Sequence, residues 1–448
     1  MDDGAIRRDV LDALEAAIRA DQYDDVEAIV QPLHESELGD VIEDLKPDLR
    51  PRLVEIMGED FDFASLTEVE DGIRKDMLEE LDNEVVAEAV QELDSDDAVY
   101  ILEDMDDEDR EEVLSQLPFA DQSKLRRSLD YPEETAGRRM QTECIAVPPF
   151  WTVGQTIDYM REAKHLPDDF SQIFVVDPSF KLIGAIALDR ILRAKRPVLI
   201  EDVMHETRHA IPASMDQEEA AMIFEQYDLL SAAVVDEGQK LVGVLTIDNI
   251  VDVIQQEAEE DIKRLVGLGD EELSDNVLST ARSRFVWLVV NLGTAVLASV
   301  VIGLFEATIG EMVALAVLMP IVASMGGNAG TQTMTVAVRA LATRDLDSGN
   351  AKRILMREML VALLNGLAFA LLMAVVALIW FSSPGLGVVI AIAMVVNMVC
   401  AAFAGMAVPI VLDRAGADPA IASSVFVTTV TDIVGFFAFL GLAALYLV

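Results

Sequence analysis

The sequence is poor in residues that carry thiol and imidazole chemistry. It contains two cysteines and four histidines among 448 residues. Cys144 and Cys400 lie far apart and form no C-x-x-C pair, so the pattern predicts neither a disulfide framework nor a cysteine zinc site. The first residues, Met-Asp-Asp-Gly, also lack the basic and apolar stretch of a secretory signal peptide. These absences argue against a secreted, disulfide-stabilised protein.

Basic residues are also scarce, but only in one part of the chain. Lys and Arg number 33 against 79 Asp and Glu, which gives a net charge of −46. Residues 281–448 contain eight acidic and eight basic residues, so the other 71 acids and 25 bases lie in residues 1–280. Such a surface repels nucleic acid and attracts cations. The alternative is an acidic surface that serves only solubility.

Residues 1–135 are predicted to be helical throughout. Apolar residues recur at helical spacing, for example in residues 10–18 and 85–117. The acidic runs at residues 94–97 and 106–109 are typical of helix N-termini, where carboxylates meet the helix dipole. A loose repeat of roughly 20 residues predicts a small helical superhelix. Clustered acids are also typical of a merely solvated face.

The next part of the chain contains an internal repeat. Residues 173–192 align without gaps on residues 232–251, at an offset of 59 residues, and 8 of 20 positions are identical. Each copy predicts two strands followed by a helix that starts at Asp189 or Asp248. No glycine-rich phosphate loop of a catalytic nucleotide site is present, so the pattern favours a sensor over a kinase.

One motif between the two copies matches the H-E-x-x-H of zinc proteases, at His205, Glu206 and His209. The motif works only on a helix, where the two imidazoles share a face. Here Pro212 follows closely, the repeat predicts linker and strand, and no third ligand is evident. We therefore expect a surface pair of histidines and no enzyme. A membrane hydrolase that uses these three residues is the alternative.

Five apolar segments occupy residues 285–305, 312–338, 354–381, 386–412 and 422–447. Each is long enough to cross ~30 Å of hydrocarbon, which takes about 20 residues. Of the eight basic residues after position 280, seven precede the first segment or lie in the loops after the second and the fourth, and Arg357 lies in the first turn of the third segment, at the same end. The positive-inside rule makes that side cytoplasmic, together with residues 1–280, and places the C-terminus outside.

The second segment holds polar residues that lipid would reject. Residues 320–339 include Asn328, Thr331, Gln332, Thr333 and Thr335. At membrane depth such side chains are tolerated only where they face protein or a water-filled cavity. Gly326 and Gly330 form a G-x-x-x-G pair, which is typical of close helix packing. Packing explains the glycines but not the amides and hydroxyls, so we predict a pore-lining helix.

Asp432 is the only carboxylate well inside any of the five segments. A charge there costs about 2.5–3.5 kcal/mol on insertion scales, so it should face a partner or water. Thr428 and Thr429 lie one turn away and Ser424 two turns away, which gives a polar stripe. An aspartate capped by the threonines is the alternative. We expect a cation site at Asp432, lined by Asn328, Ser424 and Thr428.

A polar helix is predicted at residues 250–275, between the acidic part and the apolar segments. It carries Asp252, Glu257, Glu260 and Asp261, and Asp228 lies earlier in the second copy of the repeat. Carboxylate oxygens suit hard divalent cations. We predict that these five acids form cation-sensing sites on the cytoplasmic side. An ordinary polar connector is the alternative.

Several of these motifs also occur together in one known family. Three stretches resemble motifs of the MgtE family of magnesium channels and transporters, and they follow one another as they do in that family. They are Tyr131-Pro-Glu-Glu-Thr-Ala-Gly137, residues 320–339 and Thr428-Thr-Val-Thr-Asp-Ile-Val-Gly435. The repeat resembles a tandem pair of CBS domains, a regulatory module that often binds adenine nucleotides. In such modules the positions of Asp189, Thr246 and Asp248 hold a ribose, although Ala187 replaces the hydroxyl in the first copy.

The resemblance implies a mainly α fold with five parts. These are a helical superhelix domain (1–135), two α+β CBS domains (136–200 and 201–255), a plug-like connecting helix (250–275) and a five-helix transmembrane pore domain (281–448).

The resemblance also implies a function. A homodimer would pass Mg²⁺ across the cytoplasmic (inner) membrane through a pore that contains Asp432. The pore would close when cytosolic Mg²⁺ is high, and ATP is a candidate ligand of the CBS pair. The alternatives are transport of another divalent cation, such as Co²⁺ or Mn²⁺, and a membrane-anchored nucleotide sensor that transports nothing.

Overall fold

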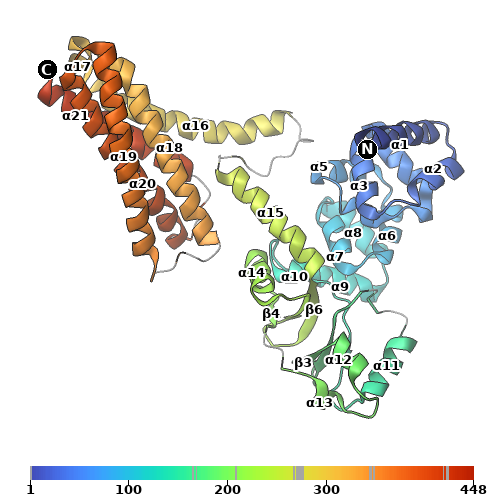
Figure 1. Ribbon diagram of the computed structural model, residues 1–448. Coiled ribbons are helices and arrows are strands. Elements are labelled where there is room, and N and C mark those ends of the chain that lie inside the picture. The colour runs from blue at the N-terminus through green and yellow to red at the C-terminus, as the bar shows by residue number, and fades with distance from the viewer. Residues whose placement is uncertain are drawn as a thin grey trace. The chain divides into compact units, whose positions relative to one another are not determined.

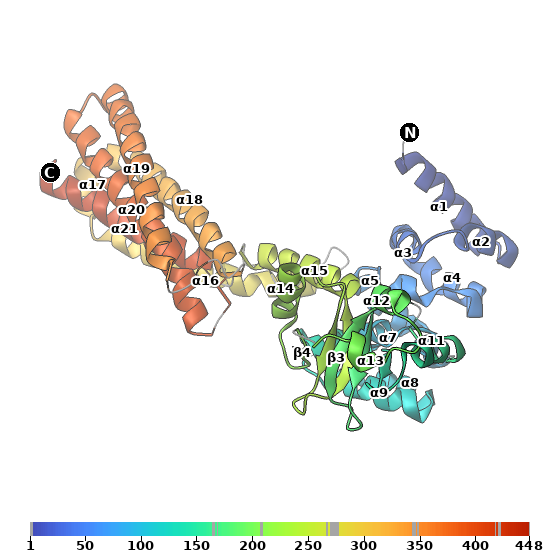
Figure 2. The same ribbon diagram turned by 60° about the horizontal axis from the view of Figure 1, so that its bottom comes forward.

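The computed structural model describes residues 3–163, 166–167, 169–206, 209–265, 268, 277–342, 346, 349–416, 418–419 and 423–447. These residues form two compact units, one up to Glu257 and one from Ala258 onward. The predicted mainly α fold is confirmed, because strands occur only between residues 146 and 246 of the described chain. Figures 1 and 2 show the elements of both units.

The first unit begins with a stack of short helices, drawn in blue to cyan in Figure 1. Apolar residues from successive helices, such as Leu14, Leu53 and Leu102, share one buried core. As the acidic runs predicted, Asp94 and Asp106 are the N-cap residues of the helices that follow them. The elements are α1 (Asp3–Arg19), α2 (Tyr23–Val30), α3 (Glu35–Asp44), η1 (Pro47–Leu49), α4 (Arg50–Met57), η2 (Gly58–Asp60), η3 (Phe63–Leu66), α5 (Asp71–Glu80), α6 (Asn83–Glu92), α7 (Ser95–Glu103), α8 (Asp107–Gln116) and α9 (Phe119–Leu129).

The repeat folds into two three-stranded sheets of identical topology. In each sheet a short parallel strand pairs with the middle strand, which pairs antiparallel with the third. Val175 lies opposite Gly184 and Val234 opposite Gly243, and both registers shift at the next residue. The predicted strand–turn–strand units are confirmed.

The elements of the first copy are α10 (Ala136–Arg139), β1 (Ala146–Val147), α11 (Val153–Glu162), β2 (Gln172–Val176), β3 (Leu182–Ala187), α12 (Leu188–Arg193) and α13 (Ile200–Val203). Those of the second are β4 (Ile211–Pro212), α14 (Gln217–Tyr227), β5 (Ser231–Val235), β6 (Leu241–Thr246) and α15 (Ile247–Leu265). The helices after β3 and β6 begin one residue earlier than predicted. Residues 266, 267 and 269–275 of the predicted connecting helix lie outside the described residues.

The second unit contains five described helices that are long and apolar enough to cross a membrane, as predicted. The central one is α20, which packs against α18, α19 and α21, while α16 packs along α21. Buried apolar residues such as Val322, Met394 and Phe439 form the core between them. The elements are α16 (Val277–Gly303), α17 (Glu306–Glu311), α18 (Ala314–Ala342), α19 (Ala351–Phe381), α20 (Pro384–Arg414) and α21 (Ser423–Tyr446).

Glycines allow α18, α20 and α21 to approach one another closely. A Cβ atom at Gly330 would lie 2.6 Å from Cγ1 of Val427, and one at Gly405 would lie 2.7 Å from the carbonyl oxygen of Gly330. Both contacts are shorter than real Cβ contacts, so only glycine permits this spacing. The packing interpretation of the G-x-x-x-G pair is therefore correct for one face of α18.

Candidate functional site

The predicted pore-lining residues of α18 lie on the face opposite its glycines. Ser324, Asn328, Thr331 and Thr335 are all exposed. Their spacing of four, three and four residues places them on one side of the helix. The glycine face and the polar face of α18 thus have different surroundings, since the first packs against neighbouring helices and the second is uncovered in the single chain.

The carboxylate of Asp432, on α21, is partly exposed. Within the described residues it makes no hydrogen bond or ion pair. The nearby threonine hydroxyls are bonded to their own helix, because Thr429 Oγ1 donates to the carbonyl oxygen of Val425 at 2.6 Å and Thr431 Oγ1 to that of Thr428 at 2.9 Å. The alternative in which threonines cap the aspartate therefore finds no support in these contacts.

Ser424 and Thr428 lie two turns and one turn before Asp432 on the same side of α21. Thr428 is exposed and Ser424 partly exposed. Together with the polar face of α18, they leave the membrane unit with hydroxyl, amide and carboxylate groups that are uncovered in the single chain. Lipid cannot satisfy such groups.

The five acids of the predicted cytoplasmic sensor do not meet at one point. Glu257 accepts a hydrogen bond from Gln217 Nε2 at 2.7 Å. Asp228 is an exposed residue at the C-cap of α14, where its backbone is left-handed with φ +51°. Partial desolvation and the charge of Asp248 raise the pKa of Asp252.

The other two sensor acids belong to the second unit, at the end of α15. Glu260 forms an ion pair with Arg264, which also binds Asp418 at 2.6 Å. Burial and the charge of Asp418 raise the pKa of Asp261. Among the described residues, no group of three or more His, Cys, Asp and Glu side chains is arranged to hold a metal ion.

A partly buried acid pair, Asp96 and Asp97, lies at the N-terminus of α7 and is not among the predicted site residues. Burial raises the pKa of Asp96 to about 6. Burial and the adjacent charge of Asp96 raise the pKa of Asp97 to about 8. The charge of Asp248, at the start of α15, contributes to both shifts. The acidic run at residues 94–97 is the sequence signal for this pair, but the same run is also typical of a helix N-terminus.

Asp96 is tied to α15 through one of its oxygens. Its Oδ2 accepts a hydrogen bond from Asn249 Nδ2 at 2.8 Å, while its Oδ1 is buried without a hydrogen-bond partner in the described chain. Glu68 adds another carboxylate nearby, since partial burial and the charge of Asp252 raise its pKa. Carboxylates from residues 68–97 and from the start of α15 therefore act on one another's pKa, with Arg139 partly offsetting the effect at Asp252.

The two copies of the repeat enclose two cavities. One of about 280 Å³ is lined by Thr246 and Asp248, two of the three residues predicted to bind a nucleotide. Glu143 and Asp169 also line it, and none of its described lining residues is Lys or Arg. The Thr246 hydroxyl donates to Asn249 Oδ1 at 2.5 Å.

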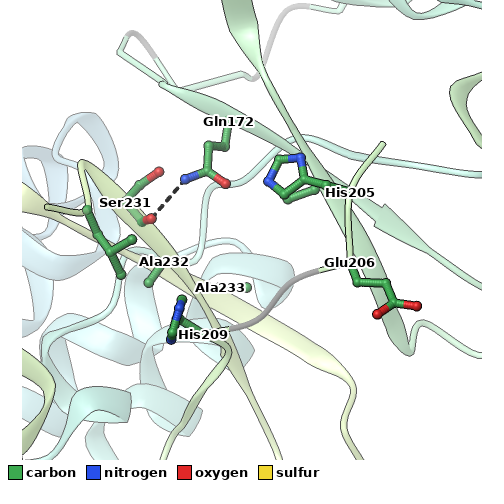
Figure 3. Close-up of a pocket in the computed structure, with 9 residues that line it drawn as sticks. Gln172, His205, Glu206, His209, Ser231, Ala232 and Ala233 are labelled. Carbon is green, nitrogen blue, oxygen red and sulfur yellow. Dashed lines mark hydrogen bonds between the residues drawn. The ribbon is translucent and has the colours of Figure 1, made fainter. Parts of the chain in front are cut away.

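The second cavity, of about 500 Å³, lies between β2, β3 and β5. Figure 3 shows Gln172, His205, His209 and Ser231 around it, with Gln172 Nε2 donating to the carbonyl oxygen of Ser231 at 3.0 Å. Its only described carboxylate is Glu206. Asp189 is not among its lining residues and lies exposed on α12.

Comparison with known proteins identifies the family. Residues 319–442 match the family model of the MgtE divalent cation transporter, residues 33–134 match the MgtE intracellular N domain, and residues 136–196 and 200–256 match the CBS domain. The magnesium transporter MgtE of Thermus thermophilus is 34% identical over 321 residues, which is 70% of each chain. The chain belongs to the MgtE family. The family predicted from three motifs is thereby confirmed.

Two further comparisons agree with this membership. The magnesium transporter MgtE of Enterococcus faecalis is 32% identical over 315 residues, again 70% of each chain. The crystal structure of the cytosolic domain of the Mg²⁺ channel MgtE in complex with ATP superposes with a TM-score of 0.50 and 23% identity, and covers 54% of this chain and 99% of that one. This second likeness concerns the fold alone.

As a member of the MgtE family, the chain falls among transporters rather than hydrolases. The H-E-x-x-H motif fits that conclusion, because neither His205 nor His209 lies on a described helix. In Figure 3 the Glu206 carboxylate points away from His209. The predicted linker is confirmed here, although Thr207 and Arg208 lie outside the described residues.

Proposed function

We propose that this chain carries Mg²⁺ across the cytoplasmic membrane through a pore formed by two copies. The observation that carries the proposal is the uncovered Asp432, which has no ion-pair partner in the described chain although it lies in a membrane-length helix. Bilayer hydrocarbon tolerates neither this charge nor the polar face of α18. A second copy that encloses a water-filled path would cover both, and the relatives are magnesium transporters.

The chemistry of Mg²⁺ fits such a path. Mg²⁺ gives up its waters reluctantly and is usually bound through one or two carboxylates. One Asp432 from each copy, at a two-fold axis, would supply two. Asn328, Ser424 and Thr428 would hydrogen-bond the retained waters. A largely hydrated ion needs no cluster of three protein ligands, which agrees with the absence of such a cluster among the described residues.

The proposal includes the predicted domain limits and topology. We assign four parts to the cytoplasm: residues 1–135, the CBS domains at 136–200 and 201–255, and the connecting helix at 250–275. The C-terminus of the pore domain at 281–448 is assigned to the outside. The support is that all eight basic residues after position 280 flank the apolar segments on a single side.

We also propose that cytosolic Mg²⁺ closes the pore. Burial is the main cause of the raised pKa values of Asp96, Asp97 and Asp252 in the first unit, and the charge of Asp248 raises all three further, which is a repulsion between carboxylates. Divalent cations would remove that repulsion and stabilise the compact arrangement, which shifts the population toward it.

The end of α15 offers a route from the sensor to the pore. Within the second unit, Leu265 packs against Met334 and Val338 of α18 and Val427 of α21. These are the helices that carry Asn328 and Asp432. Glu260 and Asp261 lie near the same C-terminal end of α15 as Leu265, beside Asp418. A change in the position of this helix end would therefore act directly on the two candidate pore helices.

ATP binding at the CBS pair is part of the same proposal, and the cytosolic domain of similar fold was crystallised with ATP. Electrostatics favours the cavity of about 500 Å³ for a polyphosphate, because it holds His205 and His209 and a single described carboxylate. The cavity at Thr246 and Asp248 holds three carboxylates, which would repel phosphates unless a cation accompanied them.

The experiment that tests the proposal is Mg²⁺ flux into liposomes that contain the full chain. Asp432→Asn keeps the shape of the side chain but removes the charge, so we expect most of the flux to be lost. The matched control is Asp413→Asn at the exposed end of α20, which we expect to conduct like wild type. Normal flux through Asp432→Asn would remove Asp432 from the ion path. No divalent flux through the wild-type chain would favour the membrane-anchored sensor.

A further inference from the structure

Asn397 is an amide buried in the middle of the membrane unit. It lies on α20 and is 0% exposed. Its Nδ2 donates to the carbonyl oxygen of Val322, on α18, at 2.9 Å. Its Oδ1 is also buried and has no hydrogen-bond partner among the described residues. An unpaired polar atom costs free energy in an apolar interior, so an apolar side chain would be more stable at this position. The presence of an amide here therefore calls for an explanation.

Two glycines on two other helices make room for this amide. A Cβ atom at Gly326 of α18 would lie 2.1 Å from Asn397 Nδ2, and one at Gly435 of α21 would lie 2.7 Å from the same atom. Neither distance is possible between real atoms, so both helices reach Asn397 only because they lack a side chain there. The amide is therefore a wedge at which α18, α20 and α21 meet.

The wedge lies next to the candidate ion path without being part of it. Gly435 follows Asp432 by three residues, which is less than one turn of α21. Gly326 precedes Asn328 by two residues on α18. Because a helix is rigid over one turn, a displacement of α21 at Gly435 moves the Asp432 carboxylate by a similar amount. Asn397 itself is fully buried.

We infer that Asn397 is a positioning residue for Asp432. Its amide occupies the space left by the missing side chains of Gly326 and Gly435 and donates a hydrogen bond to the carbonyl oxygen of Val322. It thereby fixes the spacing of the two candidate pore helices, α18 and α21. The inference rests on the proposed function. Its physical basis is that binding of a hydrated ion by two carboxylates depends on their separation, so a shift of an ångström changes which ion fits. Asn397 thereby sets ion preference as well as rate.

The test is a double-mutant cycle between Asn397 and Gly435 in the full chain, reconstituted in liposomes and assayed for Mg²⁺ and Ca²⁺ uptake. In Gly435→Ala the new methyl group collides with the amide and displaces α21. In Asn397→Ala the wedge is lost without any new contact. In the double variant the methyl group of residue 435 enters the space that the amide vacates.

We expect each single variant to shift the half-saturating Mg²⁺ concentration, and the ratio of Mg²⁺ to Ca²⁺ uptake, by about threefold or more, the size of coupling that residues in contact show. The double variant should lie closer to wild type than Gly435→Ala does. The control for a helical glycine is Gly293→Ala on α16, where a Cβ would meet nothing within 4 Å. It should leave both quantities unchanged.

A residue that merely stabilises the fold would give a different result. Its variants would lower the amount of active protein, and hence the maximal uptake, while half-saturation and ion preference stayed at the wild-type values. That result, or strict additivity of the two substitutions, would overturn the inference. If Gly435→Ala does not yield a folded protein, Asn397→Ala alone tests the inference, through the half-saturating Mg²⁺ concentration and the ratio of Mg²⁺ to Ca²⁺ uptake.

The outcome also separates this inference from the function on which it rests. If Asp432→Asn abolishes uptake and the Asn397 variants keep wild-type ion preference, the proposed pore stands and the positioning role falls. If Asp432→Asn conducts normally, both fall together, because there is then no carboxylate in the path for Asn397 to place.

Discussion

Arg264 donates a hydrogen bond from Nη1 to Oδ2 of Asp418 at 2.6 Å, and thereby ties the end of α15 to the segment between α20 and α21. The two side chains are 29% and 23% exposed, so water screens the pair in part. The neighbouring Leu265 packs against α18 and α21. Within the second unit, the ion pair therefore holds α15 to the segment between α20 and α21, and the packing of Leu265 holds it against the two candidate pore helices.

Arg264→Ala should weaken closure. We expect Mg²⁺ flux at millimolar internal Mg²⁺ to rise by up to about fivefold, because a partly exposed ion pair contributes up to about 1 kcal/mol. Flux at very low internal Mg²⁺, where the pore is open, should not change. The measurement is uptake into liposomes loaded with defined Mg²⁺ concentrations. Lys263→Ala removes an adjacent positive charge but not this pair, and should behave like wild type.

The topology makes a prediction that does not depend on the ion. Because all the bases after position 280 flank the apolar segments on one side, the C-terminus should lie outside the cell. A reporter that is active only in the cytoplasm should be silent when fused after residue 448. The same reporter fused after residue 416, between the fourth and fifth segments, should be active. The opposite pattern would mean that the orientation is inverted.

Local patterns in the sequence predicted the elements well. The five membrane-length helices follow from hydropathy alone, and the two sheets follow from a repeat in which Val175, Gly184, Val234 and Gly243 keep equivalent places. Such signals lie within a few residues of one another. The family also followed from short motifs, because each is a contiguous run.

Contacts between distant residues could not be predicted in the same way. Asn397 binds a carbonyl group 75 residues away, and Asn249 binds Asp96 across 153 residues. Nothing near Asn397 in the sequence distinguishes it from a lipid-facing or pore-lining amide. Likewise the run at residues 94–97 is a satisfactory helix N-terminus, and only the folded structure shows that Asp97 is desolvated there and feels the charges of Glu35 and Asp248.

That acid pair makes the stability of the first unit dependent on pH. The pKa of Asp97 is raised to about 8 in the folded chain. Between about pH 4, the ordinary aspartate value, and pH 8 the folded state therefore binds more protons than the unfolded state. Stability must then fall as pH rises through this window, by linkage. Thermal unfolding of the full chain in detergent with EDTA should thus show a lower melting temperature at pH 8 than at pH 6.

Asp97→Asn should flatten this dependence and raise the melting temperature at pH 8, since the amide carries no charge to desolvate. Asp107→Asn is the matched control, because that carboxylate lies in the first turn of α8, is exposed and is paired with Arg110. A pH slope that is the same in wild type and Asp97→Asn would contradict the assignment of the raised pKa to this pair.

The same carboxylates should respond to divalent cations. With 71 acids against 25 bases in residues 1–280, closely apposed acidic surfaces repel, and salt at physiological strength screens charges only beyond about 8 Å. In the folded chain the charge of Asp248 still raises the pKa of both Asp97 and Asp252. Limited proteolysis of the full chain should therefore slow within residues 1–257 as Mg²⁺ rises to millimolar concentrations.

Two variants separate sensing from mere solubility. Replacing Asp252, Glu257, Glu260 and Asp261 together by alanine should shift the Mg²⁺ concentration that protects the chain and closes the pore, while Mg²⁺ selectivity stays unchanged because Asp432 is untouched. Replacing four exposed acids of α8 (Asp107, Glu108, Glu111 and Glu112) removes the same charge elsewhere and should not shift it. If both variants behave alike, or if the cleavage pattern is the same from zero to high millimolar Mg²⁺, the acidity serves solubility, because a sensor needs particular carboxylates rather than a total charge.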